Sequence, residues 1–352
     1  MTPFDAVGIV YVAIGTKTNE TNRPTIVDVA RIAGVSRQTV SRVISDNPRV
    51  APTTRRRIEE AIEQLGYRPN RMARALVTQT SLTFGFATVD MRDLHFGDTC
   101  AGMQAAAREH GYYLVVTELD FSDDRGMGTL ETLLTLGVDG VAFFPSFLGD
   151  ADIELFARNS RRPVVMFGRT SRIPNVVSIA MDEVRAADLV IDHLVSRGKS
   201  RIGILMNEMF PDVIHERFVA LKRSIATKTD TIRPPVEADY PKINEGREAA
   251  MRLLKSHPDL NAIVAFNDTM AMGALIACLD LGLRIPQDIA VVGYDGIPFG
   301  ATANPPLTTI VQDSFGMADA AFNALLSCVA EGTPSEGEVQ LWEPKLLVRE
   351  ST

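Results

Sequence analysis

The chain has few of the residues that define several common classes of protein. Its 352 residues include only three cysteines, five histidines and one tryptophan. The cysteines are far apart and odd in number, which argues against a disulfide framework and fits reduced thiols in the cytoplasm. The histidines show no metal-ligand spacing. No stretch approaches the ~20 apolar residues that a membrane-spanning helix needs, so we expect no membrane partner.

The sequence also lacks the short motifs that mark many enzymes. There is no G-x-S-x-G nucleophile elbow, no P-loop and no complete G-x-G-x-x-G. Acidic pairs such as Asp123 and Asp124 have the pattern of solvated loop residues. We therefore expect no enzymatic activity, no catalytic residue, no metal and no cofactor. A sugar-processing enzyme, the alternative in this class, would need acid and base carboxylates facing one cleft.

Charge is distributed unevenly along the chain. Residues 25–74 hold ten arginines and no lysine against five acidic residues, a net charge of +5, whereas the whole chain carries −8. Because residues 1–24 balance at zero, the remainder carries −13. A basic head on an acidic body predicts that the head, and not the body, meets a polyanion.

The segment TIVDVARIAGVSRQTVSRVI, which starts at Thr25, has the pattern of two short helices joined by a turn at Gly34. Thr25 can cap the first helix, with Asp28 three residues on, and Ser36 can cap the second. Apolar residues recur at helical spacing on one face of each helix: Ile26, Val29, Ala30, Ala33, Val40, Val43 and Ile44. This pattern predicts a helix-turn-helix.

Polar residues form the outward face of the second helix. Arginine suits guanine and glutamine suits adenine in the major groove, while hydroxyl groups suit phosphates. An amphipathic hairpin whose outer residues meet only water would show the same spacing, so the spacing alone does not distinguish it from a DNA-reading helix. The predicted DNA-contact residues of this helix are Ser36, Arg37, Gln38, Thr39, Ser41 and Arg42.

A third helix and a short hinge follow. Pro52 suits a first helical position, an apolar face continues to Leu65, and Gly66 stops the helix. After Pro69, Asn70 can cap a helix of barely one and a half turns, which would form only against a partner. DNA is one candidate, with Leu76 as an apolar wedge at a minor-groove base step and Arg71 or Arg74 near phosphates. The alternative is a plain linker.

From Leu82 onward, short apolar or β-branched runs alternate with helical patterns. The first series contains LTFGFATV, YLVVTEL, GVAFFP and PVVMF; the second, from near Asp182, contains RIGILM, AIVAF and AVVGY. Alternation of this kind indicates two doubly wound units with parallel sheets. A cleft is expected between them, because ligands of open α/β sheets bind at the carboxyl ends of the strands.

Polar and aromatic side chains that follow these strands are the candidates for ligand contacts. They suit a polyhydroxylated ligand, because they combine forked donors, paired acceptors and aromatic faces. Residues at such positions also have ordinary structural alternatives: Asp295 can close a turn with Gly296, Arg217 can pair on the surface, and Asp268, which also follows a strand, can cap its helix. The candidates are Asp90, Phe96, Arg169, Arg217, Asn267 and Asp295.

Four stretches together resemble the lactose-repressor (LacI/GalR) family of bacterial transcription regulators. They are the helix-turn-helix segment above, the hinge NRMARAL, the stretch FNDTMAMGALIACLDLGLRIPQDIAVVGYD and PPLTTIVQD. The resemblance runs from Thr25 to the C-terminus. It implies that Arg37, Gln38 and Arg42 read operator bases, and that Leu76 wedges open the operator centre.

The resemblance also implies ligand contacts for Arg217, Asn267 and Asp295, and for Arg169 in a Gly-Arg pair, with Asp90 and Phe96 as weaker carry-overs. The fold it implies is α/β: a three-helix helix-turn-helix head and a short hinge helix, then two doubly wound parallel-sheet subdomains of periplasmic-binding-protein type. The expected bounds are 1–24 for a disordered extension, 25–69 for the head, 70–81 for the hinge and linker, 82–180 with 312–338 for the N-subdomain, and 181–311 with 339–352 for the C-subdomain.

The function predicted from the sequence is that of a cytoplasmic, homodimeric transcription regulator, a repressor under allosteric control. Its partners would be a near-palindromic double-stranded operator and a small-molecule effector, with a carbohydrate favoured. Association beyond the dimer stays open. The alternatives are a regulator that responds to a purine or another metabolite, and a sugar-binding protein without a role at DNA.

Overall fold

A computed structural model describes residues 24–44, 48–68, 80–120, 126–145, 147–207, 211–229 and 235–352. The chain divides into two units, residues 1–79 and 80–352. The extension before residue 24 and the predicted hinge helix lie outside the described residues.

The first unit contains three short helices around a small apolar core. They are α1 (Ile26–Ala33), α2 (Arg37–Ile44) and α3 (Pro52–Leu65). Gly34 and Gly66 have φ values of 61° and 59°, a left-handed conformation that ends α1 and α3 at the predicted positions. The core consists of Val29, Ala30, Ala33, Val40, Val43, Ile58 and Ala61. The sequence prediction of a three-helix head is confirmed.

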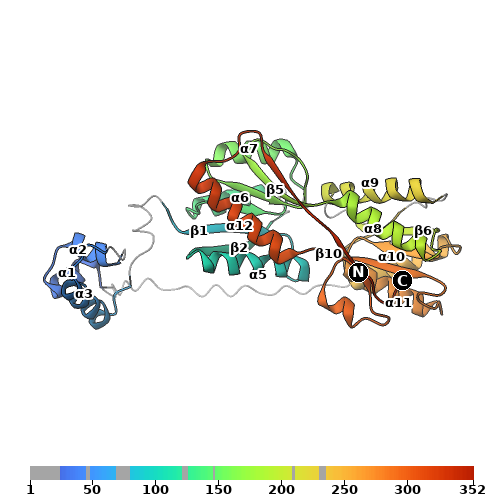
Figure 1. Cartoon of the computed structure of the whole chain (residues 1–352), viewed down its shortest axis with the longest axis horizontal. Helices are drawn as coiled ribbons and strands as arrows, with labels where there is room; N and C mark the ends of the chain where they lie inside the picture. The colour runs from blue at the N-terminus through green and yellow to red at the C-terminus, as the bar shows by residue number, and fades with distance from the viewer. Residues whose placement is uncertain are drawn as a thin grey trace, which may run out of the picture. The chain divides into compact units, whose positions relative to one another are not determined.

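The first sheet of the second unit is wholly parallel. Its strands are β1 (Thr83–Thr88), β2 (Tyr113–Glu118), β3 (Val141–Phe143), β4 (Val164–Phe167), β5 (Val176–Met181) and β11 (Glu338–Trp342), in the order β11-β5-β4-β3-β1-β2. Its helices are α5 (Leu94–Glu109), α6 (Met127–Thr135), α7 (Asp150–Ser160) and α12 (Ser314–Glu331). Helices α5 and α12 lie side by side (Figure 1).

The second sheet repeats this plan with one antiparallel edge strand. Its strands are β6 (Ile202–Asn207), β7 (Val236–Ala238), β8 (Ala262–Ala265), β9 (Ala290–Asp295), β10 (Thr308–Val311) and β12 (Lys345–Leu347), in the order β12-β10-β9-β8-β6-β7. Its helices are α8 (Glu183–Ser196), α9 (Pro211–Lys228), α10 (Ile243–Ser256) and α11 (Asp268–Asp280). The predicted pair of doubly wound subdomains is therefore present.

The chain crosses between the two sheets three times. The crossings lie between β5 and α8, between β10 and α12, and between β11 and β12. The backbone N–H of Asp182 donates to the carbonyl of Trp342 at 3.0 Å, which joins the first crossing to the third. The subdomain boundary expected after residue 338 falls within β11, because this strand pairs with β5 of the first sheet through Trp342. None of the described helices is long and apolar enough to cross a membrane.

Helices α10 and α11 approach each other through glycine. A Cβ atom added at Gly273 would meet the backbone of Ile243 and Arg247, so even a methyl group would force the helices apart. We expect Gly273→Ala to lower the free energy of unfolding by at least ~1 kcal/mol, measured by urea unfolding of the full chain. Gly97→Ala in α5 is the matched control, since its nearest neighbour is the Met91 carbonyl oxygen at 3.9 Å. Equal stability of Gly273→Ala and the unchanged chain would contradict this packing.

Candidate functional site

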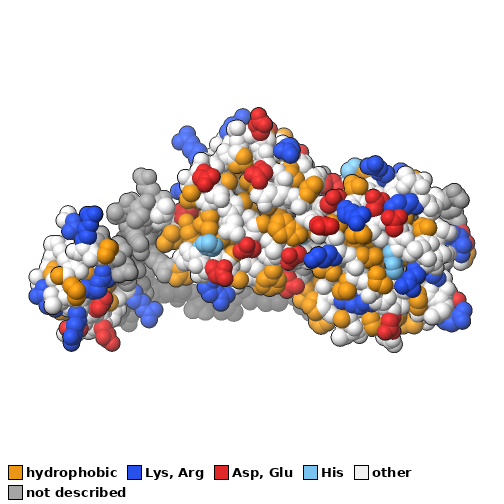
Figure 2. All heavy atoms as spheres, viewed as in Figure 1, with side chains coloured by type: hydrophobic (Ala, Val, Ile, Leu, Met, Phe, Trp, Pro, Cys, Tyr) orange, Lys and Arg blue, Asp and Glu red, His pale blue; other side chains and the backbone are white. Residues whose placement is uncertain are grey.

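The head presents the predicted polar face of α2 to solvent. Arg37, Gln38, Ser41 and Arg42 are exposed, as is Ser36, and Thr39 is half-buried. The Ser36 hydroxyl accepts from the backbone N–H of Thr39 at 3.2 Å and lies 2.9 Å from the Thr39 hydroxyl, so it caps α2 as the sequence predicts. Figure 2 shows several basic side chains on the visible face of the head. The face is thus available to a polyanion.

The remaining DNA-contact predictions fall on the hinge. Asn70, Arg74 and Leu76 lie outside the described residues. Their roles stay predictions from the sequence.

A cavity of about 910 Å³, part of it open to solvent, lies between the two sheets of the second unit. Residues from both subdomains line it, and four aromatic rings contribute to its wall: Phe96, Phe144, Phe167 and Phe266. Of the six predicted ligand contacts, four line the cavity: Phe96, Arg217, Asn267 and Asp295. Strand ends far apart in the sequence therefore meet at one site.

Arg217 is held in a buried cluster at the back of the cavity. Its Nε lies 3.2 Å from both carboxylate oxygens of Glu183, its Nη2 donates to Glu183 Oε1 at 2.9 Å, and its Nη1 donates to the carbonyl of Phe266 at 2.6 Å. The Tyr294 ring lies under the guanidinium, with 3.4 Å from Cζ to the ring centroid, and its hydroxyl donates to Glu183 Oε2 at 3.0 Å. Burial, the largest single effect, opposes the charge of Arg217, but Glu183, Tyr294 and Asp295 together outweigh it and raise the pKa of Arg217.

Asp295 lies at the end of β9 with a φ of 108°, a conformation that a residue other than glycine rarely adopts. Its Oδ1 accepts from Gln312 Nε2 at 2.7 Å, which connects β9 to the crossing between β10 and α12. Burial raises the pKa of Asp295 well above its ordinary range, and the negative charge of Asp93 raises it further. A strained, tethered carboxylate at a cavity wall is a common mark of a functional site.

Asn267 is the cap of α11. Its Oδ1 accepts from the backbone N–H of Met270 at 2.8 Å, and its Nδ2 donates to the carbonyl of Pro241 at 3.0 Å. The capping role considered for Asp268 thus belongs to Asn267. Asp268 is buried instead, where its carboxylate accepts from the Thr309 hydroxyl at 2.6 Å and the backbone N–H of Ile297 at 2.8 Å.

Two predicted ligand contacts, Asp90 and Arg169, do not line the cavity. The Arg169 guanidinium is only 2% exposed and donates to Asp150 and to the carbonyl of Leu148, both at 2.8 Å. It therefore pairs with α7, so the prediction that it faces the cleft is corrected. Asp90 lies beside the cavity, where its carboxylate accepts from Arg92 Nε at 2.8 Å.

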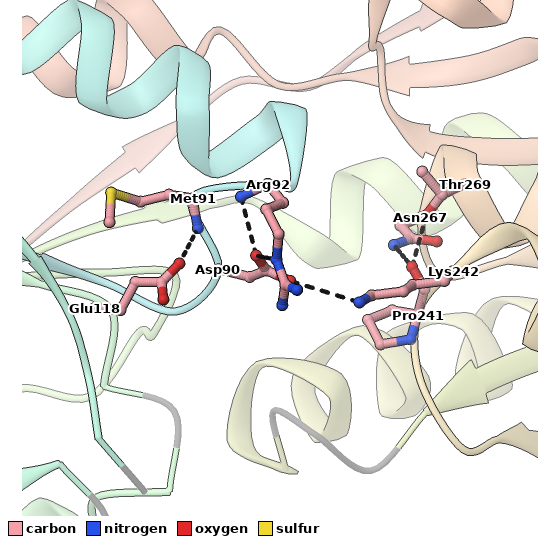
Figure 3. A network of polar contacts seen from close by, with 8 residues as sticks. All are labelled: Asp90, Met91, Arg92, Glu118, Pro241, Lys242, Asn267 and Thr269. Atoms are coloured by element: carbon pink, nitrogen blue, oxygen red, sulfur yellow. Dashed lines mark hydrogen bonds and ion pairs between the residues drawn. The ribbon is translucent and has the colours of Figure 1, made fainter. Parts of the chain in front are cut away.

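A polar contact joins the two subdomains beside the cavity. Figure 3 shows the Lys242 side chain extended toward Asp90, whose carboxylate also lies against the Arg92 side chain. Lys242 Nζ lies 3.9 Å from Asp90 Oδ2. A second contact runs from the backbone N–H of Thr170 to Glu216 Oε1 at 3.1 Å. Both contacts connect the N-subdomain to the C-subdomain.

Several residues of the cavity wall were not predicted from the sequence. Asp93 caps α5 by accepting from the backbone N–H of His95 at 2.9 Å, and His95 Nδ1 lies 3.1 Å from the Ser314 hydroxyl. Burial, with the positive charge of Arg217 nearby, lowers the pKa of His95 to about 4. The other polar residues that line the cavity and were not predicted from the sequence are Thr99, Glu183, Asn207 and Gln312.

Comparison with known families matches two parts of the chain. Residues 25–70 match the bacterial regulatory proteins of the lacI family, and residues 191–352 match the periplasmic binding protein-like domain. Catabolite control protein A of Priestia megaterium is 30% identical over 90% of this chain and 96% of its own length. The transcriptional regulator GalS of Salmonella typhimurium is 31% identical over 93% and 96%, and the repressor PurR of Aliivibrio salmonicida is 28% identical over 93% and 98%.

Solved structures resemble the whole described architecture. The lac repressor dimer bound to operator and the anti-inducer ONPF has a TM-score of 0.83 and 29% identity, covering 93% of this chain and 98% of its own. The complex of the transcriptional regulator CelR with cellobiose has a TM-score of 0.70 and 27% identity, covering 94% and 100%. These similar proteins are regulators and not enzymes.

Proposed function

The chain belongs to the LacI family of bacterial regulatory proteins, and on that premise we propose that a sugar bound in the cleft controls its affinity for operator DNA. As a member of this family it is a DNA-binding transcriptional repressor with an effector-binding domain. We also place the protein in the cytoplasm, where bacterial operator DNA lies.

The observation that carries the sugar proposal is the combination of side chains at the cavity. Four phenylalanine rings can pack against the apolar faces of a pyranose, while Asp295, Asn267 and Arg217 supply acceptors and donors for its hydroxyl groups. The bonds of Arg217 to Glu183 and Phe266 use three of its five N–H groups, so two remain for a ligand as far as the described residues show. The CelR complex contains cellobiose, which supports the same class of ligand.

At the head, we propose that α2 reads operator bases through Arg37, Gln38 and Arg42. Their exposure and the net charge of +5 in residues 25–74 support this role. We propose that Ser36, Thr39 and Ser41 position the helix through phosphate contacts. The hinge residues Asn70, Arg74 and Leu76 stay in the proposal as contacts at the operator centre, on the family resemblance.

The proposed control works by linkage between two sites. Effector in the cleft would favour one angle between the subdomains, because its contacts come from both of them. Three crossings connect the subdomains, and one of them is bonded directly to Asp295 through Gln312. A change in that angle would alter the spacing between the two hinges of the dimer, and so the spacing between the two heads. By linkage, operator binding must change effector affinity by the same factor.

We propose that the working unit is a homodimer on a near-palindromic operator, since two-fold protein symmetry requires two matching half-sites. Sites selected by the full chain from random DNA should therefore be near-palindromic. Sedimentation of the full chain with such a site should give two chains per DNA. One chain per DNA would contradict the dimer.

A purine is the second candidate for the effector. PurR repressors are among the similar proteins, and the same phenylalanine rings could stack on a planar base. Neither candidate requires a change in the proposed role of the head.

Thermal-shift screening of the full chain against a sugar panel and a purine panel tests the effector proposal. A ligand at about 100 times its Kd should stabilise the effector-binding domain by ~2.7 kcal/mol. A shift with at least one sugar and none with purines is the expected result. A shift with purines alone would assign the cleft to the second candidate.

A further inference from the structure

The charge balance of the cavity points to one class of effector. Among the described residues that line it, the ionisable side chains are Asp93, His95, Glu183, Arg217 and Asp295. Three are carboxylic acids and one is a permanent cation. His95 adds no positive charge near neutral pH, because its pKa is lowered to about 4.

The single guanidinium of this set is already neutralised. Glu183 takes both Nε and Nη2 of Arg217, at 2.9 to 3.2 Å, and the two side chains are only 8% and 10% exposed. Tyr294 completes the cluster by donating to the same carboxylate at 3.0 Å. A phosphate or carboxylate on a ligand could reach only the two remaining N–H groups of Arg217, whose charge Glu183 already offsets. A full ion pair with the ligand would require displacing Glu183 and burying that carboxylate without its cation, which is costly.

The other two carboxyl groups, of Asp93 and Asp295, supply no positive charge to hold an anion. Burial, and after it the negative charges of Asp93 and Asp268, raise the pKa of Asp295, as expected where acidic groups outnumber cations. Burial also raises the pKa of Asp93. Two cations beside the cavity, Arg92 and Lys242, lie against Asp90, which offsets part of their charge (Figure 3).

We infer that the cleft accepts an uncharged or amine-bearing effector and rejects phosphorylated ones, and that Glu183 sets this selectivity by occupying Arg217. The inference rests on the proposed role of the cleft as the effector site. It narrows the class of ligand, since a free sugar, an amino sugar or a nucleoside fits the charge balance, whereas a sugar phosphate or a nucleotide does not.

Matched pairs of ligands test the inference. Glucose with glucose 6-phosphate, galactose with galactose 6-phosphate, adenosine with adenosine monophosphate, and glucosamine would be titrated into the full chain by calorimetry. We expect at least one uncharged or amine-bearing compound to bind, and its phosphate ester to bind at least about tenfold more weakly. A phosphate ester that binds as tightly as its parent overturns the inference, and so does a panel in which no uncharged or amine-bearing compound binds.

These outcomes distinguish a failure of the proposed charge selectivity from a failure of the proposed sugar effector. Binding of adenosine but of no sugar, with adenosine monophosphate rejected, would support the charge selectivity and contradict the sugar. Binding of a sugar phosphate in preference to its parent would contradict the selectivity and leave a sugar-sensing cleft.

Glu183→Gln tests the proposed role of that residue. Removing its charge frees the guanidinium of Arg217, so the affinity for the phosphate ester relative to its parent should rise at least about tenfold. Asp192→Asn is the matched control, because it removes the same charge from α8 at a side chain that is 63% exposed and paired with Lys228. An unchanged ratio in folded Glu183→Gln would contradict the assignment.

A second variant covers the case in which Glu183→Gln does not fold. Asp93→Asn removes another carboxylate of the same cavity while keeping a side chain that can cap α5. The discrimination against the phosphate ester should fall in this variant as well. Undiminished discrimination would show that these carboxylates do not set the selectivity.

Discussion

Arg42→Ala is expected to weaken binding to the selected operator by about 5- to 150-fold, or ~1–3 kcal/mol, while binding to random DNA changes much less. The reason is that a guanidinium on the exposed face of α2 can make paired hydrogen bonds to a guanine edge, and alanine cannot. Fluorescence anisotropy with both DNAs at one fixed salt concentration measures the ratio.

Arg56→Ala provides the control for charge alone. Arg56 lies on α3, its side chain is 81% exposed, and it pairs with Glu60 at 3.0 Å. Its removal should produce a small and equal loss on both DNAs. If Arg42→Ala behaves in the same way, Arg42 contacts a phosphate and does not read a base.

Asp295→Ala is expected to weaken effector binding by about 100-fold or more and to abolish the response of operator binding to effector. The carboxylate faces the cavity, and losing it leaves ligand donors and Gln312 without their acceptor. Operator affinity without effector should be nearly unchanged. Calorimetry and operator titration on the same preparation measure the two quantities.

The backbone conformation at this position requires a second variant. Alanine at a φ of 108° carries strain of its own, whereas asparagine tolerates positive φ better and keeps the size of the side chain. Asp295→Asn should therefore fold normally and still lose most of the effector response. A normal response in both variants would remove Asp295 from the binding site.

The head could be predicted almost completely from the sequence because its determinants are local. The spacing of Val29, Ala33, Val40 and Val43 gives the buried face, and Gly34 ends the first helix as expected. Once the cap and the buried face of an eight-residue helix are known, the directions of its other side chains are nearly fixed. The outward face of α2 follows from those two facts.

The cleft could be predicted only in part. The rule that strand ends meet at one edge of a sheet placed Phe96, Asn267 and Asp295 correctly at the cavity. It failed for Arg169, since Gly168 with a φ of 78° comes directly before it and the side chain pairs with Asp150 of another element. A partner 19 residues away is not visible in a local pattern.

The cavity residues that the sequence analysis missed were missed for two reasons. Glu183 and Gln312 follow strands at the crossings between the two sheets, and their place at the cavity depends on where the chain changes sheets. Periodicity carries no information about such crossings. Asp93 was missed for the second reason: in the sequence it is indistinguishable from any other aspartate that caps a helix, and only the three-dimensional structure places it in the cavity wall.

Titration of the full chain onto its selected operator, with and without the ligand found by thermal shift, measures the coupling between cleft and head most directly. Operator affinity is predicted to change by about 5- to 150-fold at saturating ligand, with an equal factor in ligand affinity when operator is present. Superimposable operator curves with and without bound ligand would contradict the proposed control of DNA binding by the cleft.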